Sequence, residues 1–380
     1  MIMRRIVALL LFFLFFSVNS TSGSSTDPID ISFSDGDRVK VESWIEGLEI
    51  PWSLIFLHDK RALVSERPGR IRLIKDGILQ KTPFAVIDVA HIGEGGLMGM
   101  AIHPEFPQKP FIYAMHTYKK GNSFYNRVIR LKDFGDYGKF DKVIIDNIPG
   151  ARLHNGGRIA FGPDGMLYVA TGDIFNADLA QNIKSLGGKI LRISPEGEIP
   201  EDNPFKDSPV YSYGHRNPQG LAWHHETGEL FSSEHGPSGE FFRFGNDEIN
   251  VIKKGGNYGW PEIIGIKKKA PYIDPLILWE KTTPPSGIAF YTGNRLLHLK
   301  NDLFVATLRS ECLVRIKLNK ESANYKVLRI ERWFENKYGR IRDIVQGPDG
   351  LLYFLTNNRD GRGKPRIGDD KIYRILPISK

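Results

Sequence analysis

The chain has 380 residues, a formal net charge of +8 and 41% hydrophobic residues, a composition typical of a folded globular protein rather than a disordered one. Lysine and arginine are scattered without a long run, and no aromatic residues interleave with a basic groove, which argues against nucleic-acid binding. The single cysteine, Cys312, excludes an internal disulfide and a cysteine-cluster metal site.

Residues 1–28 are predicted to be a signal peptide, or an N-terminal anchor with a linker. Arg4 and Arg5 precede an apolar run at 6–16, which is shorter than the about 20 residues that a membrane-spanning helix needs. We therefore expect export to the periplasm, the cell surface or the medium, with the folded domain running over 29–380. An uncleaved segment would hold the protein at a membrane surface.

Two sets of short apolar strands alternate along the rest of the chain. One set recurs at intervals of about 60 residues, at 69–74, 127–131, 188–193, 247–252, 313–318 and 371–376. Before each of these strands stands a polar turn followed by a strand of the second set, at 56–66, 103–117, 162–173, 224–236, 299–310 and 347–358.

The uniform repeat favours one architecture. No stretch has a sustained helical period, which disfavours a parallel α/β fold, and two stacked β-sandwiches would not produce one period. Six repeats, each long enough for a four-stranded antiparallel sheet, predict an all-β, six-bladed β-propeller. Loops that leave the innermost strands of a propeller converge at one mouth. We take the second set of strands to be the innermost ones, so we expect the residues that follow them to meet at this mouth. These residues are Asp173, His235, Gly236, Pro237 and Arg309.

Four arginines are also expected near this mouth: Arg216, Arg309, Arg340 and Arg342. Arg340 and Arg342 flank one residue of an extended segment, so their side chains point the same way. Guanidinium groups bind planar carboxylates through two parallel hydrogen bonds, and clustered positive charges are costly without an anion. The cluster predicts a polyanionic ligand such as a tricarboxylate. The alternative is a set of separate surface arginines paired with Asp or Glu.

Oxygen ligands for a metal occur at 246–250 and 255–261. Asp247 and Glu248 supply carboxylates, and the glycine-rich turn around Tyr258 supplies backbone carbonyls, a donor set that favours calcium over zinc or copper. The spacing is not that of an EF-hand, and a solvated acidic turn is the alternative. We expect Glu248 to lie in a turn between blades, away from the mouth.

The chain resembles the soluble pyrroloquinoline quinone (PQQ)-dependent sugar dehydrogenases of the glucose/sorbosone and aldose sugar dehydrogenase family, which are six-bladed propellers. The resemblance rests on HNGGRIAFGPDGMLYVATGD (154–173), YSYGHRNPQGLAW (211–223), SEHGP (233–237), DEINVIKKGGNYGWP (247–261) and GRIRDIVQGPDGLLYFLT (339–356). The GHRNPQG and GGNYGWP runs within these segments are the specific ones.

The resemblance implies roles for individual residues. His154 matches the general base, which Asp173 supports, and Asp173 and Glu94 fall at sugar-contacting positions. His154, Arg216 and Asn217 match residues at the reactive edge of PQQ, and Arg216 joins His154 and Asp173 in the catalytic set. The remaining matches are Arg309, Arg340 and Arg342 for the cofactor carboxylates, the Gly236 and Pro237 carbonyls for the cofactor's calcium, and Glu248 with the Tyr258 carbonyl for a structural calcium.

Several positions depart from the family pattern. Arg309 stands in place of Lys, Glu94 and His235 in place of Gln, and Leu153 in place of Asp. These changes affect sugar contacts more than cofactor contacts, so the preferred sugar is not fixed.

The resemblance implies oxidation of aldoses at C1 to the lactone, with hydride transfer to PQQ and electrons passed to an external quinone, dye or redox protein. A calcium-dependent propeller lactonase is one alternative, and Arg340 and Arg342 argue against it. A non-catalytic extracellular binding propeller is another, but it would not need His154 and Asp173 together.

Glutamine is scarce beside Glu, Lys and Arg, which predicts a thermostable protein.

Overall fold

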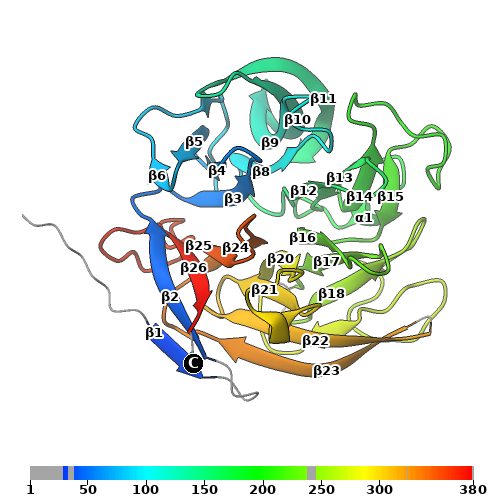
Figure 1. The fold of residues 1–380 in the computed structure, drawn as a ribbon. Helices are drawn as coiled ribbons and strands as arrows, with labels where there is room; N and C mark the ends of the chain where they lie inside the picture. The colour runs from blue at the N-terminus through cyan, green and yellow to red at the C-terminus, as the bar shows by residue number, and fades with distance from the viewer. Residues whose placement is uncertain (1–28, 33–37, 238–244, 323, 379–380) are drawn as a thin grey trace, which may run out of the picture.

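The computed structural model describes residues 29–32, 38–237, 245–322 and 324–378, which form six antiparallel sheets around one central axis (Figure 1). The helical segments of these residues are α1 (Asp178–Gln181) and the 3₁₀ turn η1 (Leu297–Leu299). The all-β, six-bladed propeller predicted from the repeats is confirmed. The expected signal or anchor at 1–28 lies outside the described residues. None of the helices in the described ranges is long and apolar enough to cross a membrane.

Five blades are built from consecutive strands, which follow one another from the central axis outward. The first contains β3 (Pro51–Phe56), β4 (Arg61–Glu66), β5 (Arg70–Lys75) and β6 (Ile78–Leu79), with β7 (Ala85–Val86) also paired to β5. The second contains β8 (Leu97–Ile102), β9 (Phe111–Lys120), β10 (Ser123–Asp133) and β11 (Gly138–Gly150). The third contains β12 (Ile159–Phe161), β13 (Leu167–Thr171), β14 (Lys189–Ile193) and β15 (Val210–Tyr213). The fourth contains β16 (Pro218–Trp223), β17 (Leu230–Glu234), β18 (Asp247–Ile252) and β19 (Ile277–Trp279). The fifth contains β20 (Pro285–Phe290), β21 (Leu303–Thr307), β22 (Leu313–Glu321) and β23 (Asn324–Trp333).

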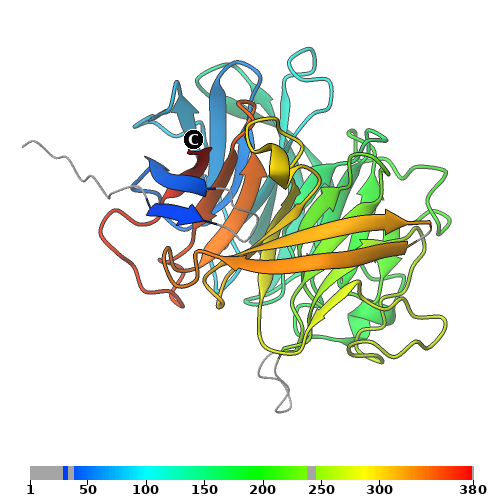
Figure 2. The same ribbon diagram turned by 60° about the horizontal axis from the view of Figure 1, so that its bottom comes forward.

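The sixth blade joins the two ends of the described chain. Its strands are β24 (Ile341–Gln346), β25 (Leu352–Thr356), β26 (Ile372–Pro377), β2 (Arg38–Ile45) and, at the outer edge, β1 (Ile29–Ser32). The blue N-terminal strands therefore lie beside the red C-terminal strand in both views (Figure 1, Figure 2). This pairing closes the ring through backbone hydrogen bonds and covers an edge that would otherwise be open.

The repeated strands occupy different places from those expected. The second set of predicted strands forms the second strand of each blade, and the innermost strands are the segments just before them, including β12 and β16. The predicted mouth residues nevertheless converge, because the end of a second strand lies beside the start of its antiparallel inner neighbour. Pro218 at the start of β16, for example, pairs with Glu234 at the end of β17.

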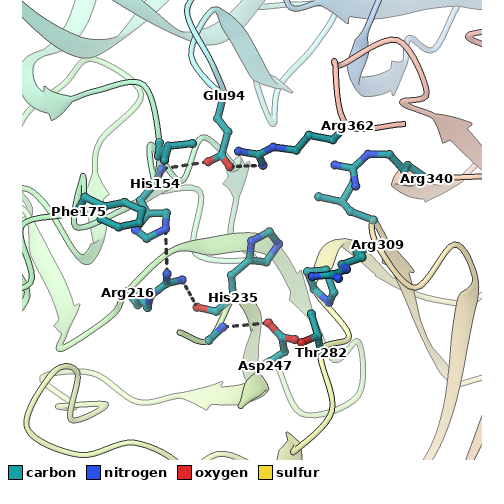
Figure 3. A pocket seen from close by; sticks show the side chains of 14 residues that line it. Glu94, His154, Phe175, Arg216, His235, Asp247, Thr282, Arg309, Arg340 and Arg362 are labelled. Atoms are coloured by element: carbon teal, nitrogen blue, oxygen red, sulfur yellow. Dashed lines mark hydrogen bonds and ion pairs between the residues drawn. The ribbon is translucent and has the colours of Figure 1, made fainter. Parts of the chain in front are cut away.

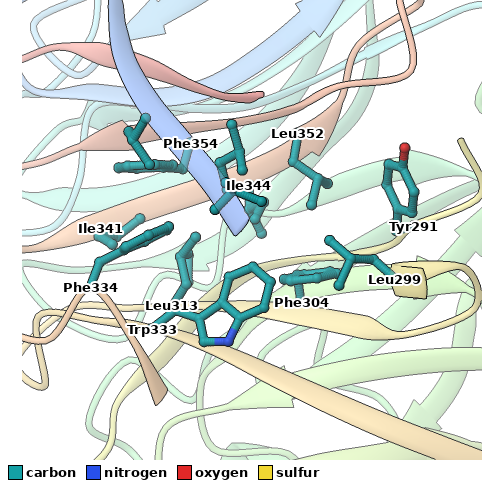
Figure 4. Close-up of a cluster of buried hydrophobic side chains, with 14 of the residues drawn as sticks. Tyr291, Leu299, Phe304, Leu313, Trp333, Phe334, Ile341, Ile344, Leu352 and Phe354 are labelled. Carbon is teal, nitrogen blue, oxygen red and sulfur yellow. The ribbon is translucent and has the colours of Figure 1, made fainter. Parts of the chain in front are cut away.

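The hydrophobic core lies between neighbouring blades. In the cluster between the fifth and sixth blades, Phe304 and Trp333 face Ile344 and Phe354 (Figure 4). The Phe304 and Trp333 rings pack edge to face with centroids 5.3 Å apart. Each fully buried apolar side chain of this kind stabilises the fold by roughly 1.5–3 kcal/mol. The packing fixes the angle between blades and thereby the positions of the loops at the mouth.

Candidate active site

A cavity of about 310 Å³ opens where the inner strands begin and the second strands end. Its lining comes from five blades and consists of Glu94, Leu153, His154, Phe175, Arg216, His235, Gly236, Asp247, Thr282, Pro284, Leu308, Arg309, Arg340 and Arg362 (Figure 3). A smaller pocket adjoins it nearer the axis and shares Glu94, His235 and Leu308 with it. The structure thus brings together six residues that were named as site candidates, namely His154, Arg216, Gly236, Arg309, Arg340 and Glu94.

His154 is held by its backbone in an uncommon conformation. Its φ of 53° is left-handed, and its carbonyl approaches Gly172 so closely that a Cβ on Gly172 would lie 1.9 Å from the oxygen. Only glycine can occupy position 172 without moving His154. The His154 N–H donates to Glu94 Oε2 at 3.0 Å, which ties the loop before β12 to the loop before β8.

The ring of His154 has a defined orientation. Nδ1 lies 2.7 Å from Asp173 Oδ1, and Nε2 lies 3.0 Å from Arg216 Nη2. Because arginine can only donate, Nε2 accepts in this arrangement and Nδ1 carries the proton that is donated to Asp173. The lone pair of a neutral imidazole therefore lies beside Arg216, in the cavity.

Two aromatic residues that the sequence analysis did not single out support this histidine. Trp260 Nε1 donates to Asp173 Oδ2 at 2.8 Å, and its ring lies 5.5 Å from the Arg216 guanidinium carbon. Phe175 stacks on the His154 ring with centroids 4.3 Å apart. Trp260 was visible in the GGNYGWP run, whereas nothing local marked Phe175. Asp173 itself is 1% exposed and is not among the cavity-lining residues, so its position suits support of His154 rather than the expected sugar contact.

The predicted arginines differ in their environments. Arg309 is exposed at the rim, while Arg340 donates to Asp360 from Nε at 3.0 Å and from Nη2 at 2.7 Å. Arg342 lines the smaller pocket, where its Nη1 donates to neutral oxygens of Gln219 and Ser286. Burial and repulsion from Arg67 lower the pKa of Arg342 to about 9.

Asn217 lies directly behind the smaller pocket. Its Oδ1 accepts the N–H of Gly156, a pocket residue, at 3.0 Å. Its Nδ2 is buried and has no hydrogen-bond partner among the described residues, as is also true of Arg342 Nε. Buried donors of this kind indicate a place where an acceptor from outside the chain is expected.

Glu94 is an anionic group at the edge of the cavity. Burial raises the pKa of its carboxyl, but attraction and hydrogen bonding by Arg362, with further attraction from His154 and His235, lower it to about 2 overall. Arg362 Nη1 lies 2.7 Å from Glu94 Oε1, so the loop after β25 reaches across the mouth to the second blade. Sequence reasoning missed Arg362 and Arg67, because no local motif marks either residue.

The predicted ligands of a cofactor-bound calcium lie at the same cavity. Gly236 lines it and Pro237 is buried beside it. The Gly236 N–H donates to Asp247 Oδ1 at 3.0 Å, and Asp247 also lines the cavity. Carbonyl and carboxylate oxygens are the ligands that calcium prefers.

Glu248 does not lie in a turn between blades. It is the second residue of strand β18 and pairs with Glu234 at the end of β17. Glu248 therefore lies at the mouth-facing end of its blade, next to the cavity-lining Asp247, and not away from the mouth as expected. Asn250 Nδ2 lies 3.2 Å from Glu248 Oε2 and 3.4 Å from Glu234 Oε2. Burial and repulsion from Glu234 raise the pKa of Glu248 to about 8.

Tyr258 belongs to the same neighbourhood. Its ring stacks on His215 with centroids 4.6 Å apart, and His215 Nδ1 lies 2.9 Å from Glu234 Oε2. Asn250 Oδ1 is buried without a hydrogen-bond partner in the described part of the chain. No group of three or more His, Cys, Asp or Glu side chains gathers as a metal site within the described ranges. A calcium here would therefore bind carbonyl oxygens and few carboxylates.

Comparison with known proteins identifies the family. The model of the Glucose / Sorbosone dehydrogenase family matches residues 48–373. A putative oxidoreductase (glucose dehydrogenase) from Thermus thermophilus has 51% sequence identity and a TM-score of 0.83, covering 89% of this chain and 100% of its own. The PQQ-bound aldose sugar dehydrogenase of Streptomyces coelicolor has 38% identity and a TM-score of 0.76, covering 90% of this chain and 98% of its own.

A curated relative agrees with these structures. Aldose sugar dehydrogenase YliI of Escherichia coli (strain K12) is 33% identical over 354 residues, which are 85% of this chain and 91% of the relative. The family match covers every cavity-lining residue, from Glu94 to Arg362. The chain belongs to the glucose/sorbosone dehydrogenase family.

Proposed function

We propose that this protein is a PQQ-dependent dehydrogenase that oxidises aldose sugars at C1 to the lactone. One observation carries the proposal: a histidine backed by an aspartate and a group of buried arginines line two adjoining pockets at the mouth. His154, backed by Asp173, supplies a base, and Arg342 supplies a buried positive charge whose hydrogen-bond acceptors are neutral. Similarity to the PQQ-bound Streptomyces coelicolor enzyme supports the same cofactor.

The residues fit a flat, polyanionic cofactor. Arg342, which lines the smaller pocket, has a buried Nε donor without a partner in the described part of the chain. Leaving such a donor unpaired costs roughly 1–3 kcal/mol, a cost that a carboxylate or carbonyl oxygen of the ligand would remove. Arg309 and Arg340 add positive charge nearer the rim, where further carboxylates would lie. The bond from Arg340 to Asp360 fixes this guanidinium in place.

Calcium is proposed at two places. The carbonyls of Gly236 and Pro237 would hold the ion that binds the cofactor, and Asp247 contributes negative charge at the same cavity. Glu248 and the Tyr258 carbonyl would hold a structural ion. Two carboxylates side by side, the buried Glu234 and the half-buried Glu248, together with the unpaired Asn250 Oδ1, fit a cation at this second place.

The chemistry follows from the side chains present. When bound, PQQ supplies the carbonyl that accepts the hydride from the anomeric carbon. His154 Nε2 takes the proton of the anomeric hydroxyl, and Asp173 stabilises the resulting imidazolium through Nδ1. Arg216 must release Nε2 for this step, and it then places positive charge where negative charge develops. Phe175 covers one face of the His154 ring and excludes water from it.

The function can be tested with purified apo-protein. PQQ and calcium together are expected to give aldose-dependent reduction of a small artificial dye, and omission of either is expected to abolish it. A nicotinamide cofactor serves as the control for another dehydrogenase class. Lactone hydrolysis without quinone would instead support a propeller lactonase, and sugar binding without turnover would support a binding propeller.

The N-terminal sequence supports a proposal for where the protein acts. We propose that the protein is exported and acts in the periplasm, at the cell surface or in the medium. The electrons taken from the sugar then pass to an acceptor outside the enzyme.

A further inference from the structure

In the loop between β25 and β26, residues 357–371, the aspartates are buried and every cation except Lys371 is exposed, while Lys371 is buried and pairs with Glu46. The aspartates Asp360, Asp369 and Asp370 have buried side chains. The cations Arg359, Arg362, Lys364 and Arg366 are all exposed. The outer face of this loop therefore carries positive charge and no exposed carboxylate.

The buried aspartates give the loop a fixed shape. Asp360 Oδ1 accepts the backbone N–H groups of Arg362 and Gly363 at 2.9 and 3.1 Å. Asp369 Oδ2 accepts the N–H of Arg366 at 2.7 Å, and Asp370 accepts the N–H groups of residues 358 and 359. Because carboxylates bind the backbone from inside, the cations are presented outward on a defined surface.

This surface lies at the mouth of the cavity. Arg362 both lines the cavity and bonds Glu94 at 2.7 Å (Figure 3). Arg366 donates to the carbonyls of Asn336 and Lys337, which brings the exposed Lys337 beside the loop. We call the set Arg309, Lys337, Arg359, Arg362, Lys364 and Arg366 the basic rim. Ile367, with 98% of its surface exposed, is an apolar contact point next to it.

We propose that the basic rim docks an acidic electron-carrier protein, which removes electrons from the sugar-reduced enzyme. The inference rests on the proposed function and adds the class of its partner. Oxidation of one aldose to its lactone releases two electrons and two protons. Two carrier molecules in turn each accept one electron, and the protons pass to solvent.

Charge and geometry favour a protein partner. A like-charged patch beside a reaction cavity accelerates encounter with a partner of opposite charge, by about 10- to 1000-fold at low salt. A small polar surface with one exposed apolar side chain suits a short-lived complex, as electron carriers require. An anionic membrane is the competing partner. Binding to a bilayer surface gains strength from the burial of several apolar side chains, whereas this loop exposes one.

The experiment uses the PQQ- and calcium-loaded enzyme with saturating aldose. Two one-electron acceptors of opposite charge are compared: the acidic copper protein plastocyanin and the basic haem protein cytochrome c. Plastocyanin is expected to be reduced at least about tenfold faster at low ionic strength, and added salt is expected to remove the difference. Equal rates, or faster reduction of cytochrome c, would overturn the proposal.

Matched charge reversals locate the surface. Lys364→Glu and Lys337→Glu change the basic rim without touching the cavity-lining residues. Lys206→Glu is the control, because its exposed side chain lies in the connection between β14 and β15. Strand β14 starts beside the mouth-facing end of β13, so this connection lies at the opposite edge. Each rim variant is expected to reduce plastocyanin roughly three- to tenfold more slowly, and the control to equal the wild type.

Small-dye reduction separates the possible failures. It is expected to stay unchanged in all three variants, since a neutral dye needs no docking surface. Loss of aldose-dependent dye reduction in the wild type would reject the proposed function and this inference with it. Normal dye reduction with equal plastocyanin rates in Lys364→Glu and Lys206→Glu would reject the docking surface alone. Binding to phosphatidylserine vesicles that Lys364→Glu abolishes, with carrier rates unchanged, would assign the rim to a membrane and overturn the proposal.

Discussion

Trp260 and Asp173, which lie 87 residues apart in the sequence, are joined by a hydrogen bond of 2.8 Å between the indole Nε1 and carboxylate Oδ2. The other carboxylate oxygen binds His154 Nδ1 at 2.7 Å. The fourth blade thus fixes an acid of the third blade, which fixes the histidine at the cavity. Such a carboxylate both orients the imidazole and stabilises its protonated form.

Replacement of His154 tests the base directly. His154→Ala is expected to lower kcat by about two to four orders of magnitude, the usual contribution of a positioned general base. Affinity for PQQ, measured by fluorescence titration, is expected to stay near that of the wild type, because the arginines remain. A kcat within a few-fold of the wild type would mean that another group accepts the proton.

The aspartate and tryptophan are predicted to act through the histidine. Asp173→Asn is expected to lower kcat and to move the acidic limb of the pH–rate profile to lower pH, since the imidazolium loses its carboxylate. Trp260→Phe keeps the carboxylate and loses one hydrogen bond, so its kcat is expected to fall less, with the pH–rate profile unchanged. Equal pH–rate profiles for Asp173→Asn and the wild type would contradict this positioning role.

The propeller could be predicted from the sequence because its signals are local. Each GPDG-type turn and the alternation after it, as at 162–173, specify a hairpin without reference to the rest of the chain. The order of strands from the axis is set by packing between blades, which no single repeat encodes. For that reason the sequence alone predicts the second strands innermost. For Glu248 it gives two conflicting expectations, a strand at 247–252 and a turn between blades, and the structure bears out the strand.

The residues of the candidate site also fall into two groups, those that the local sequence marks and those that only the fold brings to the mouth. His154, Arg216 and Asn217 stand in glycine- and asparagine-rich turns that mark them. Arg67 and Arg362 act at the mouth only because distant loops fold together. Arg67 is buried in a turn after β4, and its effect on the pKa of Arg342 could not be read from its neighbours in sequence.

Arg342 is predicted to bind a carboxylate of the cofactor. Arg342→Ala is expected to weaken PQQ binding by roughly 1.5–3 kcal/mol, the contribution of a charge-assisted hydrogen bond. Arg342→Lys keeps the charge but loses the planar fork, so its loss is expected to be intermediate. Titration of apo-protein with PQQ measures both variants. Unchanged PQQ affinity with weaker aldose binding would assign Arg342 to the sugar.

His116 is predicted to destabilise the protein in acid. Burial lowers its pKa from 6.5 to about 4, with a further contribution from Arg127. As the pH falls through this window, the unfolded chain takes up a proton that the folded protein resists, so stability is lost progressively below about pH 6.5. The total is about 3 kcal/mol, at about 1.4 kcal/mol for each pH unit.

His116→Gln is expected to remove this part of the acid dependence, which is measured by urea unfolding at pH 7 and pH 4.5. The exposed His58 provides the control, and His58→Gln is expected to keep the wild-type dependence. Identical acid dependence in His116→Gln and the wild type would show that His116 is protonated in the folded state.

Glu248 is predicted to bind a calcium ion that stabilises the fold. Burial and Glu234 raise the pKa of the Glu248 carboxyl to about 8, so without calcium this carboxyl takes up a proton on folding at neutral pH, which costs stability. Glu248→Gln removes this cost and is expected to melt at or above the wild-type temperature without calcium. With calcium the order is expected to reverse, since only the wild type retains the carboxylate ligand.

Asp202→Asn, at an exposed carboxylate, is the matched control. Differential scanning calorimetry with calcium or chelator measures the crossing, and turnover of Glu248→Gln at moderate temperature is expected to stay near the wild type. An equal calcium-induced rise of Tm in Glu248→Gln and the wild type would place the ion elsewhere, and lost turnover with unchanged Tm would place Glu248 in the reaction itself.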